Sequence, residues 1–244
     1  KISVGPPFFN KLILPFLIPF MLAMAIGPKL KWIKSDIEDK IYLISFFVIS
    51  LILSVLIIRN LDINFLYNTI LITAAFYLFF ITLRDFFHRK YRNLSQITAH
   101  FSFSILILSI LFNNIFSSEV ITNLKINETY QAQNLKINFE SIEQENKQNF
   151  KAIKGKFIVE DQSGLIEVMQ PELRIYNQPN IVTSEADIKT NIFTDKFMTM
   201  NYVQNQDYFN IRYQVKPFMI WIWISTILLC FSGCLSLIKK KYEK

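Results

Sequence analysis

The stretch Ile41–Ile58, IYLISFFVISLILSVLII, decides the class of this protein. It contains no charged side chain, and it is long enough as a helix to cross the hydrocarbon core of a bilayer, which is about 30 Å thick. Such a run is too long and too uniformly apolar for an ordinary helix in a soluble domain. The stretch therefore predicts a membrane-spanning helix.

Further apolar stretches lie on both sides of it, at about residues 12–26, 65–83, 97–116 and 218–238. The chain of 244 residues is 52% hydrophobic and has 24 Phe but only 5 Gly, which excludes a disordered or collagen-like protein. The first stretch is short and carries Pro15 and Pro19, so we expect it to be kinked, tilted or partly interfacial. The sequence predicts an α-helical integral membrane protein with five transmembrane helices.

Basic residues fall unevenly on the two sides that five spans would define. One side holds three groups of four: Lys29, Lys31, Lys34 and Lys40; Arg84, Arg89, Lys90 and Arg92; Lys239, Lys240, Lys241 and Lys244. The short segments on the other side hold only Lys1, Lys11 and Arg59. The positive-inside rule then places the N-terminus outside and the C-terminus inside. The net charge of +7 is explained by an inner face that meets anionic membrane lipid, so nothing supports a nucleic-acid partner.

The same topology places residues 117–217 outside the membrane as an inserted domain. This segment is near neutral, and its apolar residues alternate with polar ones over 209–215, which is typical of a half-buried strand. Further strands are predicted at 156–160, 165–169 and 194–203, with a turn at 161–164. We expect a small, mostly antiparallel β-domain of about six strands with a barrel-like form. The domains are then 1–116 in the membrane, 117–217 outside, and 218–244 as the last span with its basic tail.

Few residues of the chain carry obvious chemistry. Residues 117–217 contain neither His nor Cys, which excludes a hydrolase of the triad type there. Cys230 and Cys234 lie in one apolar run and are interpreted as small packing residues. Four aromatic residues at span ends are interpreted as interfacial anchors, with a binding role for the last two as the alternative: Trp32, Tyr42, Trp221 and Trp223.

The two histidines differ in their surroundings. His88 lies in a cation-rich inner loop and is interpreted as a solvated interfacial residue, whereas His100 lies about one turn inside the fourth span. An ionisable group inside a span is costly and is by default a functional hypothesis. An intramembrane His can be an axial haem ligand, a proton relay or a hydrogen-bond donor between helices, and the residues alone leave these three open. A six-coordinate haem would need a second ligand from elsewhere.

Polar residues occur on opposite faces of the span that carries His100. Gln96, Ser104 and Asn114 share its face, and the other face carries a second set: Ser102, Ser109 and Asn113. Because lipid cannot satisfy such groups, we expect further helices around this span, from another chain or from an upstream part of the protein.

Short motifs follow one another along the chain in a fixed order. They are VGPPFFN at 4–10, Pro15, Ile26-Gly27-Pro28 followed by Trp32, Ala99-His100, PELRIY at 171–176, TSEA at 183–186, Lys216-Pro217-Phe218 and Trp221-Ile222-Trp223. This ordered set resembles the C-terminal part of the cytochrome c-type biogenesis protein CcmF family (CcmF/CycK/CcsA), the membrane haem lyases of the system I pathway. Ser102 stands where the family's Ala-His-x-Gly has its glycine, and TSEA has one residue inserted into Thr-Glu-Ala.

The resemblance implies a part in cytochrome c maturation. Members of the family attach haem to the Cys-x-x-Cys-His of apocytochrome c, receive haem from the carrier CcmE and work with CcmH. They also hold a b-type haem between two intramembrane histidines, and His100 matches the second of these. The resemblance therefore implies that His100 is an axial ligand of the haem iron, with the other ligand supplied by an N-terminal CcmF part or a partner chain.

The family's Trp-rich exported motif, which grips the incoming haem, is not found in this sequence. We therefore expect a component of a holocytochrome c synthase, either a fragment of a longer chain or the C-terminal subunit of a split one, and we assign no catalytic residue. The alternative is a membrane-tethered assembly or binding module of the same pathway without a haem ligand of its own. A transporter half is less favoured, since the spans show no paired charges and no inverted repeat. The expected location is the bacterial inner membrane, with the mitochondrial inner membrane as the alternative.

Overall fold

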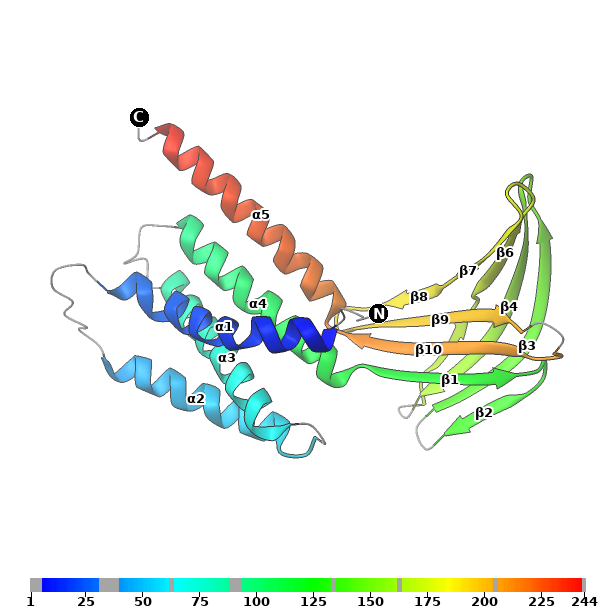
Figure 1. Ribbon diagram of the computed structural model, residues 1–244, viewed down its shortest axis with the longest axis horizontal. Coiled ribbons are helices and arrows are strands. Elements are labelled where there is room, and N and C mark those ends of the chain that lie inside the picture. Colours follow the sequence, from blue (N-terminus) through cyan, green and yellow to red (C-terminus); the bar gives the residue numbers. More distant parts are fainter. Residues whose placement is uncertain are drawn as a thin grey trace. The chain divides into compact units, whose positions relative to one another are not determined.

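The computed structural model describes residues 6–30, 40–61, 64–87, 94–132, 135–161, 164–203 and 206–242. His88, Trp32 and the middle of both predicted inner loops lie outside the described residues. The chain forms two compact units, which are described separately below. The helical unit combines Lys1–Leu111 with Trp221–Lys244, and the β unit is Phe112–Ile220 (Figure 1).

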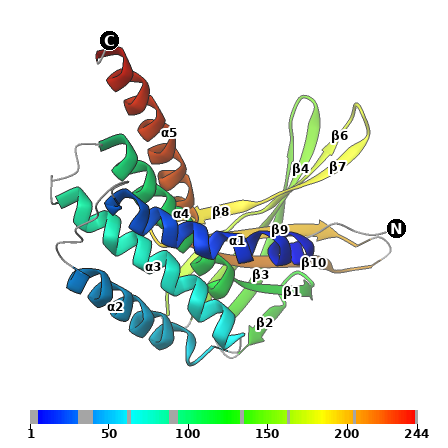
Figure 2. The same ribbon diagram turned by 60° about the vertical axis from the view of Figure 1, so that its left-hand side comes forward.

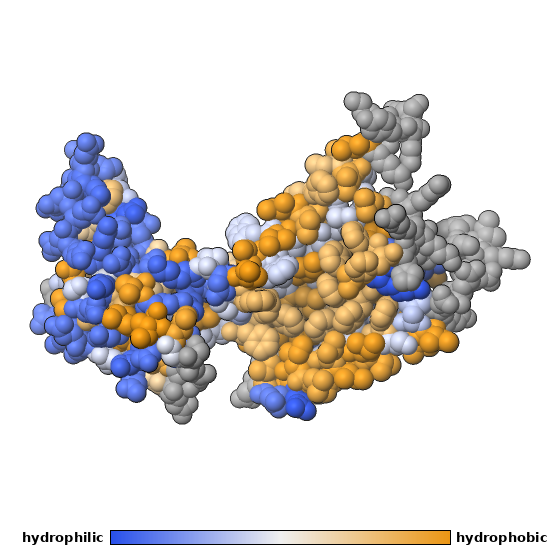
Figure 3. Space-filling view, turned by 180° about the vertical axis from the view of Figure 1, so that it is seen from behind, coloured by the Kyte–Doolittle hydropathy of each residue, from blue (hydrophilic) through white to orange (hydrophobic). Residues whose placement is uncertain are grey.

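The described helices follow the apolar stretches of the sequence. They are α1 (Pro6–Ile26), the short 3₁₀ helix η1 (Gly27–Lys29), α2 (Lys40–Ile58), α3 (Phe65–Phe87), α4 (Leu94–Phe116) and α5 (Met219–Tyr242). Among the described residues, four segments are long and apolar enough to cross a membrane: Ile41–Ile58, Phe65–Phe87, Leu94–Phe116 and Met219–Ile238. Figure 3 shows the apolar surface that these helices present. The chain is therefore an integral membrane protein with an inserted β domain.

α1 differs from these four helices in the length of its apolar stretch. It has 21 residues with Pro15 and Pro19 inside it, and the apolar stretch found there, Pro15–Lys29, is shorter than the other four. A helix of that many residues is about 31 Å long at 1.5 Å per residue, enough to reach across a bilayer core. A fifth span and the N-out, C-in orientation remain predictions.

α3 lies in the middle of the helical unit, since both α1 and α2 pack against it. Over half of its span is buried, compared with 17% for α2 and 11% for α5. The buried hydroxyls of Ser54, Thr73 and Thr82 each donate a hydrogen bond to the backbone carbonyl four residues earlier in their own helix, over 2.6–2.8 Å. These polar groups are satisfied without a partner helix, as an apolar environment requires.

The β unit contains ten described strands. They are β1 (Ser118–Leu124), β2 (Thr129–Ala132), β3 (Leu135–Asn146), β4 (Phe150–Asp161), β5 (Ile166–Met169), β6 (Glu172–Tyr176), β7 (Ile181–Glu185), β8 (Asp187–Thr190), β9 (Thr194–Tyr202) and β10 (Phe209–Pro217). One sheet has the order β1-β10-β9-β8 and the other β2-β3-β4-β6-β7, with β5 also paired to β4. All described pairings are antiparallel. Figure 2 shows the β6–β7 hairpin beside β4.

The predicted strands at 156–160, 165–169, 194–203 and 209–215 are confirmed, but the expected count of about six is wrong. The missed strands include β2, β7 and β8, which have only four or five residues each. A strand that short contributes two or three side chains to each face, too few to produce a recognisable alternation. The strands are divided between two sheets that enclose one core, as in a β-sandwich or half-barrel.

The core of the β unit lies between the sheets. The rings of Phe139 and Phe157 stack with centroids 4.3 Å apart, and both side chains are fully buried. Gly155 leaves room for this stack, because a Cβ there would lie 2.6 Å from the Phe157 ring and 2.8 Å from the sulfur of Met200. Aliphatic and sulfur-containing side chains fill the rest: Leu124, Ile137, Val159, Met169, Leu173, Met198 and Ile211.

The first and last strands of the β unit pair with each other. Ser118 of β1 lies opposite Val215 of β10, and the two strands stay in register to Leu124 and Phe209. Phe218 then turns the chain from β10 into α5 with φ 61, in the left-handed region that is uncommon for a residue with a side chain. Both connections to the membrane helices therefore lie at one end of the same sheet.

Candidate functional site

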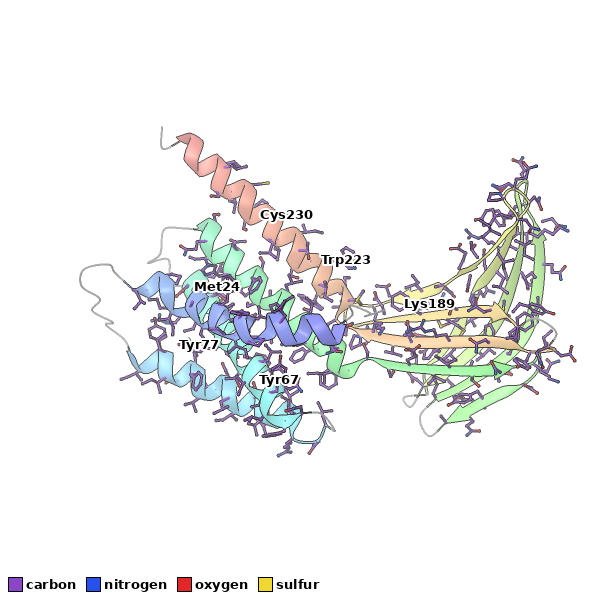
Figure 4. The ribbon with its side chains drawn as sticks, viewed as in Figure 1. Met24, Tyr67, Tyr77, Lys189, Trp223 and Cys230 are labelled. Atoms are coloured by element: carbon purple, nitrogen blue, oxygen red, sulfur yellow. The ribbon has the colours of Figure 1, made fainter. Side chains whose placement is uncertain are left out.

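His100 lies in the second turn of α4 and is half-buried. The backbone of Met24, on α1, interacts with the imidazole, so two helices meet at this residue. Figure 4 labels Met24 on α1. The charges of Asp85 and Lys29 also act on the imidazole. The structure thus places the predicted site residue at a junction of α1, α3 and α4.

The two charged residues beside His100 form a buried ion pair. The ammonium of Lys29 lies 2.8 Å from Oδ1 and 2.5 Å from Oδ2 of Asp85, and the two side chains are 4% and 10% exposed. Lys29 ends η1, directly after α1, and Asp85 lies in the last turn of α3. A charge in such a place is stable only when it is paired, because desolvation of a lone charge costs several kcal/mol.

The sequence did not predict this pair, because it placed Lys29 in an inner loop and ended the third span at about residue 83, before Asp85. Asp85 belongs to the candidate span Phe65–Phe87, and its partner is 56 residues away. No periodicity within one helix can reveal such a pair. A second basic residue of the predicted inner side, Arg84, lies over the ring of Tyr42 at 3.6 Å, a cation–π contact between α3 and α2.

Other polar residues of α4 are satisfied more locally than expected. Ser102 and Ser104 are fully buried, and their hydroxyls donate to the backbone carbonyls of Thr98 and Phe101 over 2.7 Å. Asn113 donates to the carbonyl of Pro217 inside the β unit. The serines therefore do not require surrounding helices, and the sequence argument for additional helices around α4 loses this support.

The cysteines and tryptophans of α5 provide no reacting group at the His100 junction. Cys230 and Cys234 are free thiols on the exposed surface of the helix. Trp223 is 64% exposed in the first turns of α5, which fits an interfacial anchor. Figure 4 shows Trp223 and Cys230 on the same helix.

In the β unit, two of the quoted motifs come together in one hairpin. Residues 171–176 include β6 and residues 183–186 end β7, so Glu172 lies opposite Glu185 in the ladder. The Arg174 guanidinium donates to the Glu172 carboxylate over 3.1 Å and lies 5.2 Å from the centre of the Phe150 ring. This carboxylate raises the pKa of Arg174. The hairpin presents fixed charges to a partner but offers no nucleophile.

Sequence reasoning missed a lysine inside the sandwich. Lys196 of β9 has a side chain only 11% exposed, and its ammonium lies 2.8 Å from Glu167 and 3.6 Å from Asp161 on the opposite sheet. The signal was present in the predicted strand 194–203, because Lys196 is in phase with the inward-facing Met198 and Met200. A lysine at an inward position requires a buried acid, and this group ties the two sheets together.

Comparison with known proteins relates the chain to one family. The family model "CcmF C-terminal beta-sandwich" matches residues 115–217. The cytochrome c-type biogenesis protein CcmF of Pseudomonas fluorescens is 26% identical over 258 residues, which cover 100% of this chain and 39% of that protein. The CcmF of Escherichia coli is 24% identical over 100% of this chain and 39% of its own length, and the cytochrome c-type biogenesis protein ccl1 of Rhodobacter capsulatus is 25% identical over the same shares.

A solved structure shares the fold. The cytochrome c haem lyase CcmF superposes with a TM-score of 0.74 at 18% sequence identity, covering 93% of this chain and 40% of that one. The chain therefore spans about two fifths of the length of the relatives it matches. Along this length it is similar to CcmF, and residues 115–217 match the C-terminal β-sandwich of that family.

Proposed function

We propose that this chain is the C-terminal portion of a haem lyase for cytochrome c maturation, and that His100 supplies one axial ligand to an intramembrane b-type haem. The observation that supports this most is the position of the imidazole. It is half-buried within an apolar helix and is held by a backbone group of a neighbouring helix. A metal-ligating histidine usually donates its other ring N–H to a carbonyl or carboxylate, which fixes the ring and its tautomer.

The residues around His100 fit a haem ligand. The Met24 backbone interacts with the imidazole, and a ring nitrogen held in this way would leave the other nitrogen for iron. Lys29 and Asp85 carry opposite charges, so the pair adds no net charge beside the imidazole. A b-type haem would supply one-electron chemistry at this place. The second axial ligand would come from an N-terminal CcmF part or a partner chain.

The experiment is spectroscopic. The chain is co-produced with an N-terminal CcmF part, purified from membranes, and compared with its His100→Ala and His100→Met variants. The first variant should lose most of the bound b haem, with partial recovery in added imidazole, and the second should give the changed spectrum of a His/Met pair. The matched controls are Asn114→Ala, an exposed polar residue of the same helix, and His88→Ala, and both should keep the haem. An unchanged spectrum in His100→Ala would refute the ligand assignment.

The same contact with Met24 also favours a second candidate function. A hydrogen bond between α4 and α1 is what an imidazole with a purely structural part would make. The chain would then be a membrane-tethered assembly module of the pathway. In that case His100→Ala keeps the haem spectrum while it lowers the thermal stability of the helical unit, so one pair of measurements separates the two functions.

The proposal also covers the location of the chain and its partners. The chain would work in the bacterial inner membrane, where the β unit would receive haem from the carrier CcmE or present apocytochrome c together with CcmH. The paired motifs of β6 and β7 are the best candidate surface, because Arg174 and Glu172 are fixed there by each other and by Phe150. Cross-linking from position 174 to CcmE or CcmH in membranes would test this step. Absence of both products, with folding intact, would exclude this surface.

A further inference from the structure

Two large apolar side chains stand out from one bend of the β unit. Ile192 and Phe193, between β8 and β9, are each 62% exposed. The bend itself is rigid, because the side-chain oxygen of Asn191 accepts the backbone N–H groups of Phe193 and Thr194 over 2.8 and 2.7 Å. The backbone N–H of Asn191 in turn donates to the carbonyl of Thr194. These hydrogen bonds hold the backbone of the bend, and its two large apolar side chains are exposed.

The position of this bend is fixed by the chain that leads into α5. Thr194 lies opposite Pro217 at the end of the β9–β10 ladder. Next to this pair, the backbone N–H of Phe218 donates to the carbonyl of Phe193 over 2.7 Å. The candidate span begins one residue later, at Met219. Ile192 and Phe193 therefore lie beside the point where the polar strand β10 ends and the apolar helix α5 begins.

The end of α4 lies at this level too. Asn113 donates to the carbonyl of Pro217 over 2.7 Å, and the ring of Phe112 lies 5.4 Å from that of Phe218. The candidate span of α4 ends at Phe116, close to these contacts in the chain. Two spans thus change from apolar helix to polar strand beside the same bend, and this change marks the edge of the hydrocarbon core.

We propose that the bend 191–193 is a lipid-contact site, in which Ile192 and Phe193 insert into the outer boundary of the bilayer beside the start of α5. Apolar and aromatic side chains at this depth bury their surface among headgroups and the first acyl carbons. The partner is the membrane surface and not another protein, because the contacts of Phe193 and Phe218 continue directly into two membrane spans. The site would hold this end of the sandwich at the membrane independently of whether His100 binds haem.

The test is a measurement of immersion depth by electron paramagnetic resonance. The full chain, with Cys230 and Cys234 replaced by Ala, carries a single nitroxide label at Ile192→Cys or Phe193→Cys and is reconstituted in vesicles of phosphatidylcholine and phosphatidylglycerol. Collisions with oxygen, which concentrates in lipid, are compared with collisions with a water-soluble nickel chelate.

The matched control is Ile126→Cys. Ile126 is also an exposed isoleucine in a turn, but it follows β1, whose seven residues carry the chain roughly 23 Å from the end of α4. Labels at 192 and 193 should favour oxygen over nickel at least several-fold more than the label at 126. Equal accessibility at all three sites would place the bend in water and overturn the proposal. Protection of 192 and 193 from both reagents would show that protein covers the bend, which also overturns it.

Discussion

Lys29 and Asp85 are 56 residues apart in the chain, yet their side chains form an ion pair whose Nζ and Oδ2 atoms are 2.5 Å apart. The pair joins η1, which directly follows α1, to the last turn of α3, and both its charges and the backbone of Met24 on α1 act on the imidazole of His100. Any change that moves the end of α1 should therefore also move the carbonyl that orients the imidazole. We therefore expect the position of the His100 imidazole to depend on this charge pair.

Removal of one member of this pair should destabilise the helical unit strongly. Lys29→Met or Asp85→Leu alone should lower the free energy of unfolding by about 3–5 kcal/mol, because each leaves a buried charge without its partner. The double variant should recover most of the loss. Denaturant titration in mixed micelles measures the effect. The control is Lys136→Ala, which breaks a surface pair with side chains 51% and 44% exposed and should cost less than about 1 kcal/mol. Additive losses in the double variant would contradict the ion-pair interpretation.

Gly155 should not tolerate even one additional methyl group. A Cβ there would lie 2.6 Å from the Phe157 ring, so Gly155→Ala should destabilise the β unit by about 1–3 kcal/mol through overpacking. Gly233→Ala is the matched control, because nothing lies within 4 Å of its would-be Cβ and alanine favours helix. Thermal unfolding followed by circular dichroism distinguishes the two variants. An unchanged midpoint of thermal unfolding in Gly155→Ala would contradict the prediction, because it would mean that the Phe139 and Phe157 rings can shift to make room for the methyl group at little cost.

Tyr213 should make the β unit sensitive to alkali. Burial raises the pKa of Tyr213 to about 12, whereas the tyrosine of an unfolded chain ionises near 10. Between these values the unfolded chain binds fewer protons than the folded protein, so stability that is complete below pH 10 is lost as pH rises toward 12. Relative to Tyr213→Phe, the wild type should lose about 2–3 kcal/mol over this range.

The matched control for this pH effect is Tyr202→Phe, because Tyr202 is 57% exposed. It should follow the wild type at every pH. Denaturant titrations at pH 9.5 and 11.5 are sufficient for all three proteins. Parallel stability curves for the wild type and Tyr213→Phe would show that the phenol ionises without cost in the folded state.

The topology can be tested with reporter fusions. Reporters after residues 90 and 244 should be active on the inner side, and a reporter inserted within 140–150 should be active outside, because most of the basic residues between spans lie on one side. The burial of Lys29 removes one charge from that asymmetry without reversing it. An outer signal at residue 90 would exclude the five-span arrangement.

Much of the fold could be predicted from local pattern. Apolar runs such as Ile41–Ile58 predicted the membrane helices, and the alternation at 209–215 predicted β10. In both cases the signal repeats over many residues of one element. Short strands such as β8 gave no signal, since Asp187–Thr190 contains a single large apolar residue. Their place in the sheet is decided by pairing with β9 and not by their own composition.

The candidate site was predicted only in part. His100 could be recognised because an ionisable residue within an apolar run is conspicuous by itself. Its neighbours could not, because the Met24 contact involves a backbone group that carries no sequence signal, and the Lys29–Asp85 pair joins two helices. Lys196 could have been predicted in part. Its phase with Met198 indicates that its side chain points inward, but the acids that neutralise it come from the other sheet, and the sequence does not show this pairing.

The pairing of β1 with β10 also has a consequence for biogenesis. β1 is the first strand to be synthesised, but in the four-stranded sheet its one neighbour is β10. Glu119 therefore meets Gln214 and Arg212 only after the remaining strands have been made. Until then the edge of β1 stays open to wrong partners, as expected for contacts of large sequence separation. Because α5 follows β10 almost directly, completion of the sheet coincides with insertion of the last helix. Closure of the sandwich should therefore be a late event in the assembly of the protein.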